Sequence, residues 1–358
     1  MAVSAAPRSP GGFSRRDLTS FGVTTALAVI AIALKVGPAG PLAVFIAAGI
    51  AVAALAYVLG EATEQAGESS SPRLAALLNA TFGNAPELII VVLTVNAGLI
   101  GVAKASIIGS VLGNILLILG LSLIVGGLRH GNLTFDRRPA GVNASMLTLA
   151  VVLMALPTLF AQLGHTTTGD ERTVSYGAAG LMLLVYAAYL FHSLRQPQET
   201  ETERHPRWSK RTALVVLAVS AVATGVLSEV LVNAIEPTIK STGVSETFVG
   251  LIIVPALGNI AEHLSAVRIA WRGNLDFSMG IVFNSGLQVA LFITAAAVLA
   301  GTIVGNDLTI VFPPLELAVL GAAAIMAAFV TADGEATWIE GLQLVAIYVL
   351  AALAFWYR

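Results

Sequence analysis

The sequence predicts an all-α polytopic membrane protein of about eleven transmembrane helices, with one extra N-terminal helix followed by an inverted repeat of two five-helix halves. Three observations predict this fold. Of the 358 residues, 56% are apolar and only 11% are charged, and the mean hydropathy is +0.85, which leaves too little charge to cover a soluble globule of this size. Apolar stretches long enough to cross a bilayer recur along the chain. One polar motif occurs twice, 175 residues apart.

The apolar stretches define the expected helices, because a span needs roughly 20 mostly apolar residues. They are 19–36, 41–59, 74–95, 99–125, 140–160, 173–193, 212–233, 247–270, 277–304, 313–330 and 336–357. With the N-terminus placed in the cytoplasm, fourteen of the nineteen Lys and Arg residues fall on the cytoplasmic side, as the positive-inside rule requires. We therefore expect a cytoplasmic N-terminus and a C-terminus outside.

The longest connection between spans divides the chain into two halves. The predicted organisation is a cytoplasmic N-terminus and extra helix at 1–40, a first five-helix repeat at 41–194, a cytoplasmic linker at 195–211 and a second five-helix repeat at 212–358. Five is an odd number of spans, so the second half enters the membrane from the opposite face. The result is an inverted repeat with a pseudo-two-fold axis in the membrane plane.

The first copy of the repeated motif is Gly-Asn-Ala-Pro-Glu at 83–87, inside an apolar span. A carboxylate such as Glu87 at this depth costs about 2.5–3.5 kcal/mol on insertion scales, so it needs a compensating role. Pro86 lacks an N–H and Gly83 weakens the helix, so we expect a break here that frees the carbonyl of Phe82. Freed carbonyls inside a membrane protein can bind cations.

The second copy is Gly-Asn-Ile-Ala-Glu-His at 258–263, where Glu262 stands 175 residues after Glu87. Pro255 is expected to break this helix too and to free the carbonyl of Leu251. Two inverted copies would bring the breaks face to face near the membrane midplane. Carboxylates, carbonyls and Asn amides would then form an all-oxygen cage, which suits Ca²⁺ better than Mg²⁺ or a softer transition metal, and the chain has no Cys to offer a thiolate.

These residues also predict a transport rule. Two facing carboxylates that lack solvent repel each other, so they should hold either protons or a divalent cation. A protein that changes its access side only when this site is neutral would exchange Ca²⁺ for H⁺ by alternating access, with both ions as transported substrates and no cofactor. A Na⁺- or K⁺-coupled Ca²⁺ exchanger on the same fold and a passive cation channel remain open. An enzyme is not indicated, because we find no convincing nucleophile and no His-rich metal cluster.

Further polar residues follow each motif. Ser110 and Ser285 keep the same 175-residue offset. Asn114 shares a helix face with Ser110, and Gln288 shares one with Ser285. They are candidates for lining the ion pathway, although polar side chains also hold membrane helices together. His263 is a candidate for a proton relay or for packing beside the site.

Two more glutamates, Glu61 and Glu229, lie near the expected ends of the second and seventh spans. We consider them candidates for a gate or vestibule, with a solvated helix face as the alternative.

Together these motifs resemble the calcium/proton antiporter branch of the cation/calcium exchanger superfamily. The segments 83–87 and 258–263 look like its two signature motifs and 284–288 looks like the element after the second, so the resemblance covers 41–357. It implies that two glutamates bind the cation and accept protons, and that glycine carbonyls are further ligands. The residues implied as cation ligands are Glu87, Glu262, Gly83, Gly258, Asn84 and Asn259. Gly-Asn instead of Gly-Thr-Ser ahead of both glutamates favours protons over sodium.

The expected surroundings of the protein follow from its charge and loops. A net charge of −2 argues against a nucleic-acid partner, so the expected partner is the lipid bilayer, and a homo-oligomer is left open. The central loop is short and only mildly acidic, so the acidic regulatory helix of some relatives is expected to be missing. Compact loops and an arginine-rich composition favour a prokaryotic cytoplasmic (inner) membrane.

Overall fold

The computed structural model describes residues 12–164, 166–195 and 206–357. Up to residue 195 its elements are α1 (Arg15–Val36), α2 (Pro41–Glu68), α3 (Pro72–Phe82), α4 (Ala85–Asn96), α5 (Ile100–Leu112), the π-helix η1 (Gly113–Ile118), α6 (Leu119–His130), β1 (Leu133–Thr134), α7 (Arg137–Leu163) and α8 (Thr168–Ser193). From residue 206 they are α9 (Lys210–Thr242), α10 (Glu246–Phe248), the π-helix η2 (Val249–Ile253), α11 (Val254–Trp271), α12 (Leu275–Leu287), the π-helix η3 (Gln288–Ile293), α13 (Thr294–Val304), α14 (Pro314–Val330), β2 (Glu335–Ala336) and α15 (Trp338–Trp356).

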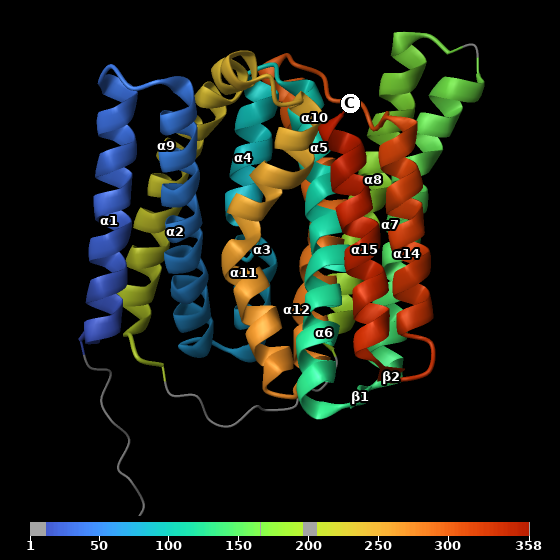
Figure 1. Cartoon of the computed structure of the whole chain (residues 1–358), viewed down its shortest axis with the longest axis horizontal. Coiled ribbons are helices and arrows are strands. Elements are labelled where there is room, and N and C mark those ends of the chain that lie inside the picture. The colour runs from blue at the N-terminus through green and yellow to red at the C-terminus, as the bar shows by residue number, and fades with distance from the viewer. Residues whose placement is uncertain (1–11, 165, 196–205, 358) are drawn as a thin grey trace, which may run out of the picture.

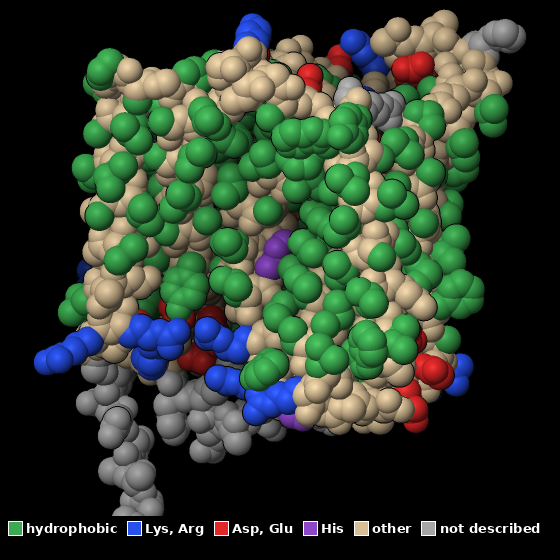
Figure 2. Space-filling view, viewed as in Figure 1, with side chains coloured by type: hydrophobic (Ala, Val, Ile, Leu, Met, Phe, Trp, Pro, Cys, Tyr) green, Lys and Arg blue, Asp and Glu red, His purple; other side chains and the backbone are tan. Residues whose placement is uncertain are grey.

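The predicted all-α membrane fold is confirmed. Ten helical stretches in the described residues are long and apolar enough to cross a bilayer, and α14 is a shorter apolar helix beside them. The helices run between two ends of the molecule (Figure 1), apolar side chains cover the flank seen in Figure 2, and Lys and Arg gather at one end of that flank. The chain is therefore an integral membrane protein.

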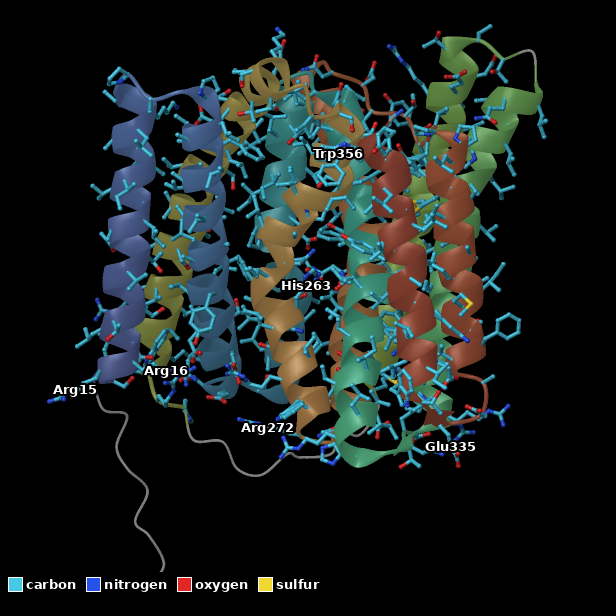
Figure 3. The ribbon with its side chains drawn as sticks, in the orientation of Figure 1. Arg15, Arg16, His263, Arg272, Glu335 and Trp356 are labelled. Atoms are coloured by element: carbon cyan, nitrogen blue, oxygen red, sulfur yellow. The ribbon has the colours of Figure 1, made fainter. Side chains whose placement is uncertain are left out.

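The two ends of the bundle differ in what they carry. Arg15, Arg16 and Arg272 lie at one end, and Trp356 lies at the other (Figure 3). At the arginine-bearing end, a two-residue antiparallel pair joins β1 to β2, with Leu133 opposite Ala336. This pair was not predicted, because two residues per strand are too few to show an alternating pattern.

Two helices extend furthest beyond the ends that hydropathy predicted. Helix α2 continues to Glu68 instead of ending at 59, and α9 continues to Thr242 instead of ending at 233. Glu and Gln lower the hydropathy of these turns but are good helix formers. The added turns of α2 also pack against protein, since Ala62 and Ala66 are fully buried. Glu61 and Glu229 consequently lie inside helices and not at their ends.

The two motif helices depart from regularity in different ways. As predicted, the first motif breaks its span, since α3 ends at Phe82 and α4 begins at Ala85. The second motif differs from the expectation, because α11 runs without interruption through Gly258. Its irregularity is the widened π-helical turn η2, which precedes Pro255. Pro255 follows this turn inside a helix that runs without a break from Glu246 to Trp271, so its missing N–H leaves an upstream carbonyl without its helical donor.

Helices of the two halves pack against one another throughout the bundle. Helix α2 lies along α9, and α6 lies along α15. At the second contact Gly120 and Gly341 bring two backbones together, because a methyl group on Gly341 would lie 2.5 Å from the Gly120 carbonyl oxygen. Such small-residue contacts allow close packing of membrane helices.

We predict that Gly341→Ala destabilises the protein by about 1–3 kcal/mol, because the added carbon overpacks the α6–α15 contact. Gly321→Ala in α14 is the matched control, since a methyl group there meets no atom within 4 Å. Thermal unfolding of the purified protein in detergent measures both variants. Equal melting temperatures for the two variants would contradict the assigned contact.

Candidate ion-binding site

The two sequence motifs meet inside the bundle, on α4 and α11. Glu87 is 4% exposed, and a methyl group on Gly258 would lie 2.9 Å from the Glu87 Cγ, so only glycine allows this approach. The Asn259 amide donates a hydrogen bond to Glu87 Oε1. Residues 172 positions apart in the chain therefore belong to one buried site.

Each glutamate is also held by a serine from its own half. Ser110 in α5 donates to Glu87 Oε1 at 2.6 Å. Ser285 in α12, at the 175-residue offset, lies beside the Glu262 carboxyl. The offset seen in the sequence thus describes equivalent contacts in three dimensions.

Amide side chains connect these two serine–glutamate pairs. Asn84 Oδ1 accepts from the Ser285 hydroxyl at 3.0 Å, and Asn84 Nδ2 donates to Gln288 Oε1 at 2.9 Å. Asn114 Nδ2 donates to Ser285 Oγ and to the Ser110 carbonyl, both at 3.1 Å. These five side chains, from both halves, are 1–6% exposed.

Three polar atoms of this region have no hydrogen-bond partner among the described residues. They are Glu87 Oε2, Glu262 Oε2 and His263 Nε2, all buried. Buried polar atoms are nearly always paired, and a carboxylate oxygen without a donor is suited to a cation or a proton. The described residues contain no cluster of three His, Cys, Asp or Glu, so a cation here would need amide or backbone oxygens beside the two carboxylates.

His263 lies about halfway between the two ends of the bundle (Figure 3), in a hollow of the flank shown in Figure 2. Its Cε1 is 4.0 Å from the position that a methyl group on Gly113 would take. The imidazole therefore packs against η1, next to the site.

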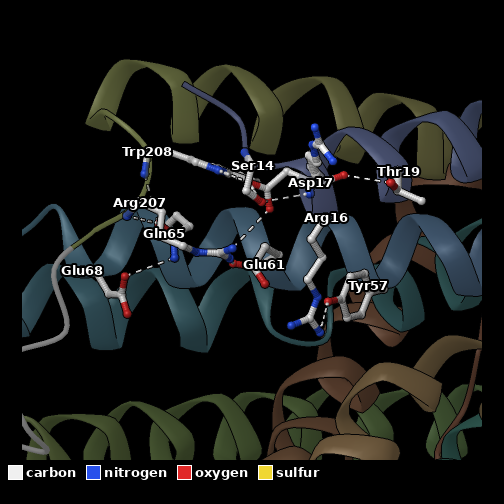
Figure 4. A network of polar contacts seen from close by, with 11 residues as sticks. Ser14, Arg16, Asp17, Thr19, Tyr57, Glu61, Gln65, Glu68, Arg207 and Trp208 are labelled. Atoms are coloured by element: carbon white, nitrogen blue, oxygen red, sulfur yellow. Dashed lines mark hydrogen bonds and ion pairs between the residues drawn. The ribbon is translucent and has the colours of Figure 1, made fainter. Parts of the chain in front are cut away.

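Glu61 and Glu229 are not part of the site. Glu61 pairs with Arg207, which also contacts Asp17 Oδ1 at 3.3 Å, near the start of α1 (Figure 4). Glu229 is exposed on α9. A gate or vestibule role for either residue stays a prediction.

The contacts around Asp17 were missed by sequence reasoning. Asp17 is 5% exposed and accepts from the Trp208 indole at 3.2 Å, while Gln65 Oε1 accepts from the backbone N–H of Arg207 at 2.7 Å. These contacts fasten the chain just before α9 to α1 and α2. The sequence held one signal of this arrangement, a Ser14-x-x-Asp17 capping box at the start of α1.

The model of the family described as sodium/calcium exchanger protein matches residues 40–195 and, separately, 212–357. The chain belongs to this family. The exchanger is 35% identical over 339 residues to a protein of Aphanothece halophytica named Ca(2+)/H(+) antiporter, a match that covers 88% of this chain and 90% of that protein. It is 36% identical over 317 residues to the Ca(2+)/H(+) antiporter ChaA of Bacillus subtilis, with 86% and 90% covered.

A solved structure agrees with these relatives. The exchanger matches the structure of native YfkE with a TM-score of 0.83 and 32% sequence identity, over 95% of this chain and 100% of that chain. The comparisons confirm the family resemblance that the two motifs predicted.

We predict that Asp17→Ala destabilises the exchanger by about 1–3 kcal/mol, because it leaves the buried Trp208 indole N–H without its acceptor. The control is Glu236→Ala, which removes an exposed ion pair to Lys240 at 2.5 Å and should cost at most about 1 kcal/mol. Thermal unfolding compares the two. A larger loss for Glu236→Ala than for Asp17→Ala would show that the Asp17 contacts contribute little.

Proposed function

We propose that the exchanger is a secondary active transporter that exchanges Ca²⁺ for H⁺ by alternating access, with Glu87 and Glu262 binding either ion. One observation carries this proposal. The two carboxylates lie at one network of buried side chains from different halves of the chain, and each keeps one oxygen without a hydrogen-bond partner among the described residues. Relatives that carry the name Ca(2+)/H(+) antiporter match nearly the whole chain and support the same function.

Electrostatics explains why the two ions should alternate. Two ionised carboxylates in a low-dielectric interior repel each other and have lost their hydration, so the empty charged site is unfavourable. Protonation removes both charges, and a divalent cation balances them. The barrier to moving the site between the two sides of the membrane is therefore low only when the site carries protons or Ca²⁺.

The oxygen atoms around the site suit Ca²⁺, which takes six to eight oxygen ligands in flexible geometry at about 2.3–2.6 Å. The proposed ligands are the Glu87 and Glu262 carboxylates, the side-chain oxygens of Asn84 and Asn259, and the Gly83 carbonyl at the helix break. The carbonyl of Gly258 belongs to a regular turn of α11, so its predicted ligation would require that turn to open.

Protonation of Glu262 would change the hydrogen bonds that the Ser285 hydroxyl can make in this network. Ser285 has one hydroxyl proton and can donate it to Asn84 or to Glu262, but not to both at once. A protonated Glu262 can instead donate to Ser285 Oγ, which leaves Ser285 free to donate to Asn84. Protonation of one glutamate thus changes the hydrogen bonds of an Asn from the other half.

We predict that Glu87→Gln and Glu262→Gln each abolish Ca²⁺ uptake driven by a pH gradient, because an amide can neither take up a proton nor balance Ca²⁺. The measurement is uptake into proteoliposomes that contain a Ca²⁺ dye. The matched control is Glu236→Gln, which changes an exposed glutamate at a distance from the network and should transport normally.

The same proteoliposomes distinguish the alternatives. Uptake driven by a sodium or potassium gradient without a pH gradient would favour the Na⁺- or K⁺-coupled exchanger. Ca²⁺ flux without any counter-ion would favour a channel. Retained pH-driven uptake in either Gln variant would show that the pair does not have the proposed role.

We further propose that the exchanger lies in a prokaryotic cytoplasmic membrane with its N-terminus inside, and that residues 41–194 and 212–358 are the two inverted halves. The charge bias supports this orientation, since Lys and Arg gather at the end of the bundle that carries Arg15 and Arg272. The two separate family matches support the division into halves.

We predict that a membrane-impermeant thiol reagent labels Tyr357→Cys in intact cells, whereas Glu335→Cys reacts only after permeabilisation. The two sites lie at opposite ends of the bundle, next to Trp356 and at the labelled Glu335 (Figure 3), and the chain has no other Cys. The reverse labelling pattern would invert the proposed orientation.

A further inference from the structure

The site departs from two-fold symmetry at Gln288. Glu87, Asn84 and Ser110 have counterparts of the same type 175 residues later, at Glu262, Asn259 and Ser285. At the same offset, however, Gln288 corresponds to Gly113, which has no side chain. The first half carries its own amide one position later, at Asn114, where the second half has Val289, so the two amides do not occupy equivalent places.

Gln288 bridges the break in the first motif helix. Its Oε1 accepts from Asn84 Nδ2 at 2.9 Å, and its Nε2 donates to the Ala80 carbonyl at 2.8 Å. Ala80 lies in the last turn of α3, and Asn84 is the residue before α4. One buried side chain from η3 thus holds both sides of the break.

The end of α3 needs such a partner. The last carbonyls of a helix have no donor within the helix, and an unpaired carbonyl in a low-dielectric interior is costly. The Asn79 carbonyl accepts a hydrogen bond from the N–H of Gly83 at 2.8 Å, and the Ala80 carbonyl accepts one from the Gln288 side-chain amide. The Tyr186 hydroxyl approaches the same Ala80 oxygen at 3.4 Å, a longer contact from α8.

Gln288 also makes the two glutamates unequal. Asn259 donates its amide hydrogen to Glu87, across the interface between halves. The symmetric contact would be donation from Asn84 to Glu262, but the Asn84 amide nitrogen is engaged by Gln288. Glu262 Oε2 has no donor among the described residues, whereas Asn259 donates to Glu87 Oε1.

We propose that Gln288 is a positioning residue that sets the affinity of the site for Ca²⁺. It fixes the geometry of the α3–α4 break, and it keeps the Asn84 amide nitrogen away from Glu262 so that this carboxylate stays available to the cation. This inference rests on the proposed exchange function and assigns Gln288 a role other than lining the path or binding the ion.

The first test is transport by Gln288→Met, which keeps the side-chain length but loses both hydrogen bonds. We expect the KM for Ca²⁺ to rise about tenfold and the maximal rate to change less than twofold, because the loss affects ion binding more than turnover. Gln343→Met, at an exposed glutamine of α15, is the control and should match the unchanged protein.

The second test measures the break itself and does not depend on transport. Spin labels are placed on Leu77→Cys in α3 and Leu184→Cys in α8, which are 42% and 66% exposed in a chain without native Cys. Pulsed electron paramagnetic resonance should give one narrow distance distribution with Gln288 present and a broad one with Gln288→Met. Gln288→Glu keeps the acceptor for Asn84 and loses the donor to Ala80, so it should also broaden the distance distribution. This second variant replaces Gln288→Met in the measurement if the Met variant does not fold.

The outcomes separate the two proposals. An unchanged KM together with unchanged distances would overturn the role of Gln288. A lower melting temperature without a change in KM or in the distances would also overturn it, because it would indicate that Gln288 contributes only to packing. If the unchanged protein transports no Ca²⁺, the exchange function fails, while the distance measurement still decides whether Gln288 fixes the break.

Discussion

The structure depends on one constraint, which is that two carboxylates cannot remain charged and uncompensated inside a membrane protein. The backbone of α11 approaches Glu87 closely because Gly258 has no side chain. Ser110 and Asn259 then donate to one oxygen of that carboxylate and leave the other without a partner among the described residues. Protein groups thus satisfy only part of this carboxylate, and a cation or a proton on the other oxygen would complete it, as the proposed exchange requires.

The two halves supply the same residue types but do not make the same contacts. The first motif sits at a helix break, whereas the second lies in a continuous helix behind a π-helical turn. Gln288 spans the break, and Gly113 at the equivalent offset leaves room for the imidazole of His263. The halves therefore share residue types at the 175-residue offset, but each glutamate has its own surroundings.

Much of the fold could be predicted from the sequence because membrane burial leaves a strong hydropathy signal. The helix break at 83–84 also followed from Gly83 and Pro86, whose effects act within one turn. The lengths of α2 and α9 could not be predicted from hydropathy, because Glu61 and its neighbours are polar yet helical and packed on protein. The π-helical turns were missed because a local residue pattern does not distinguish a widened turn from a regular one.

By itself, the sequence determined that the chain is a duplicated membrane protein with one motif glutamate per half, since hydropathy, motif type and the 175-residue offset are properties of the chain alone. Only the tertiary structure decided which groups share hydrogen bonds. It showed that Asn259 donates a hydrogen bond to Glu87, that Asn84 donates one to Gln288, and that Glu61 forms an ion pair with Arg207. The physical reason is that hydrogen bonds between distant segments depend on how helices are rotated and spaced against one another, and periodicity along the chain does not specify that arrangement.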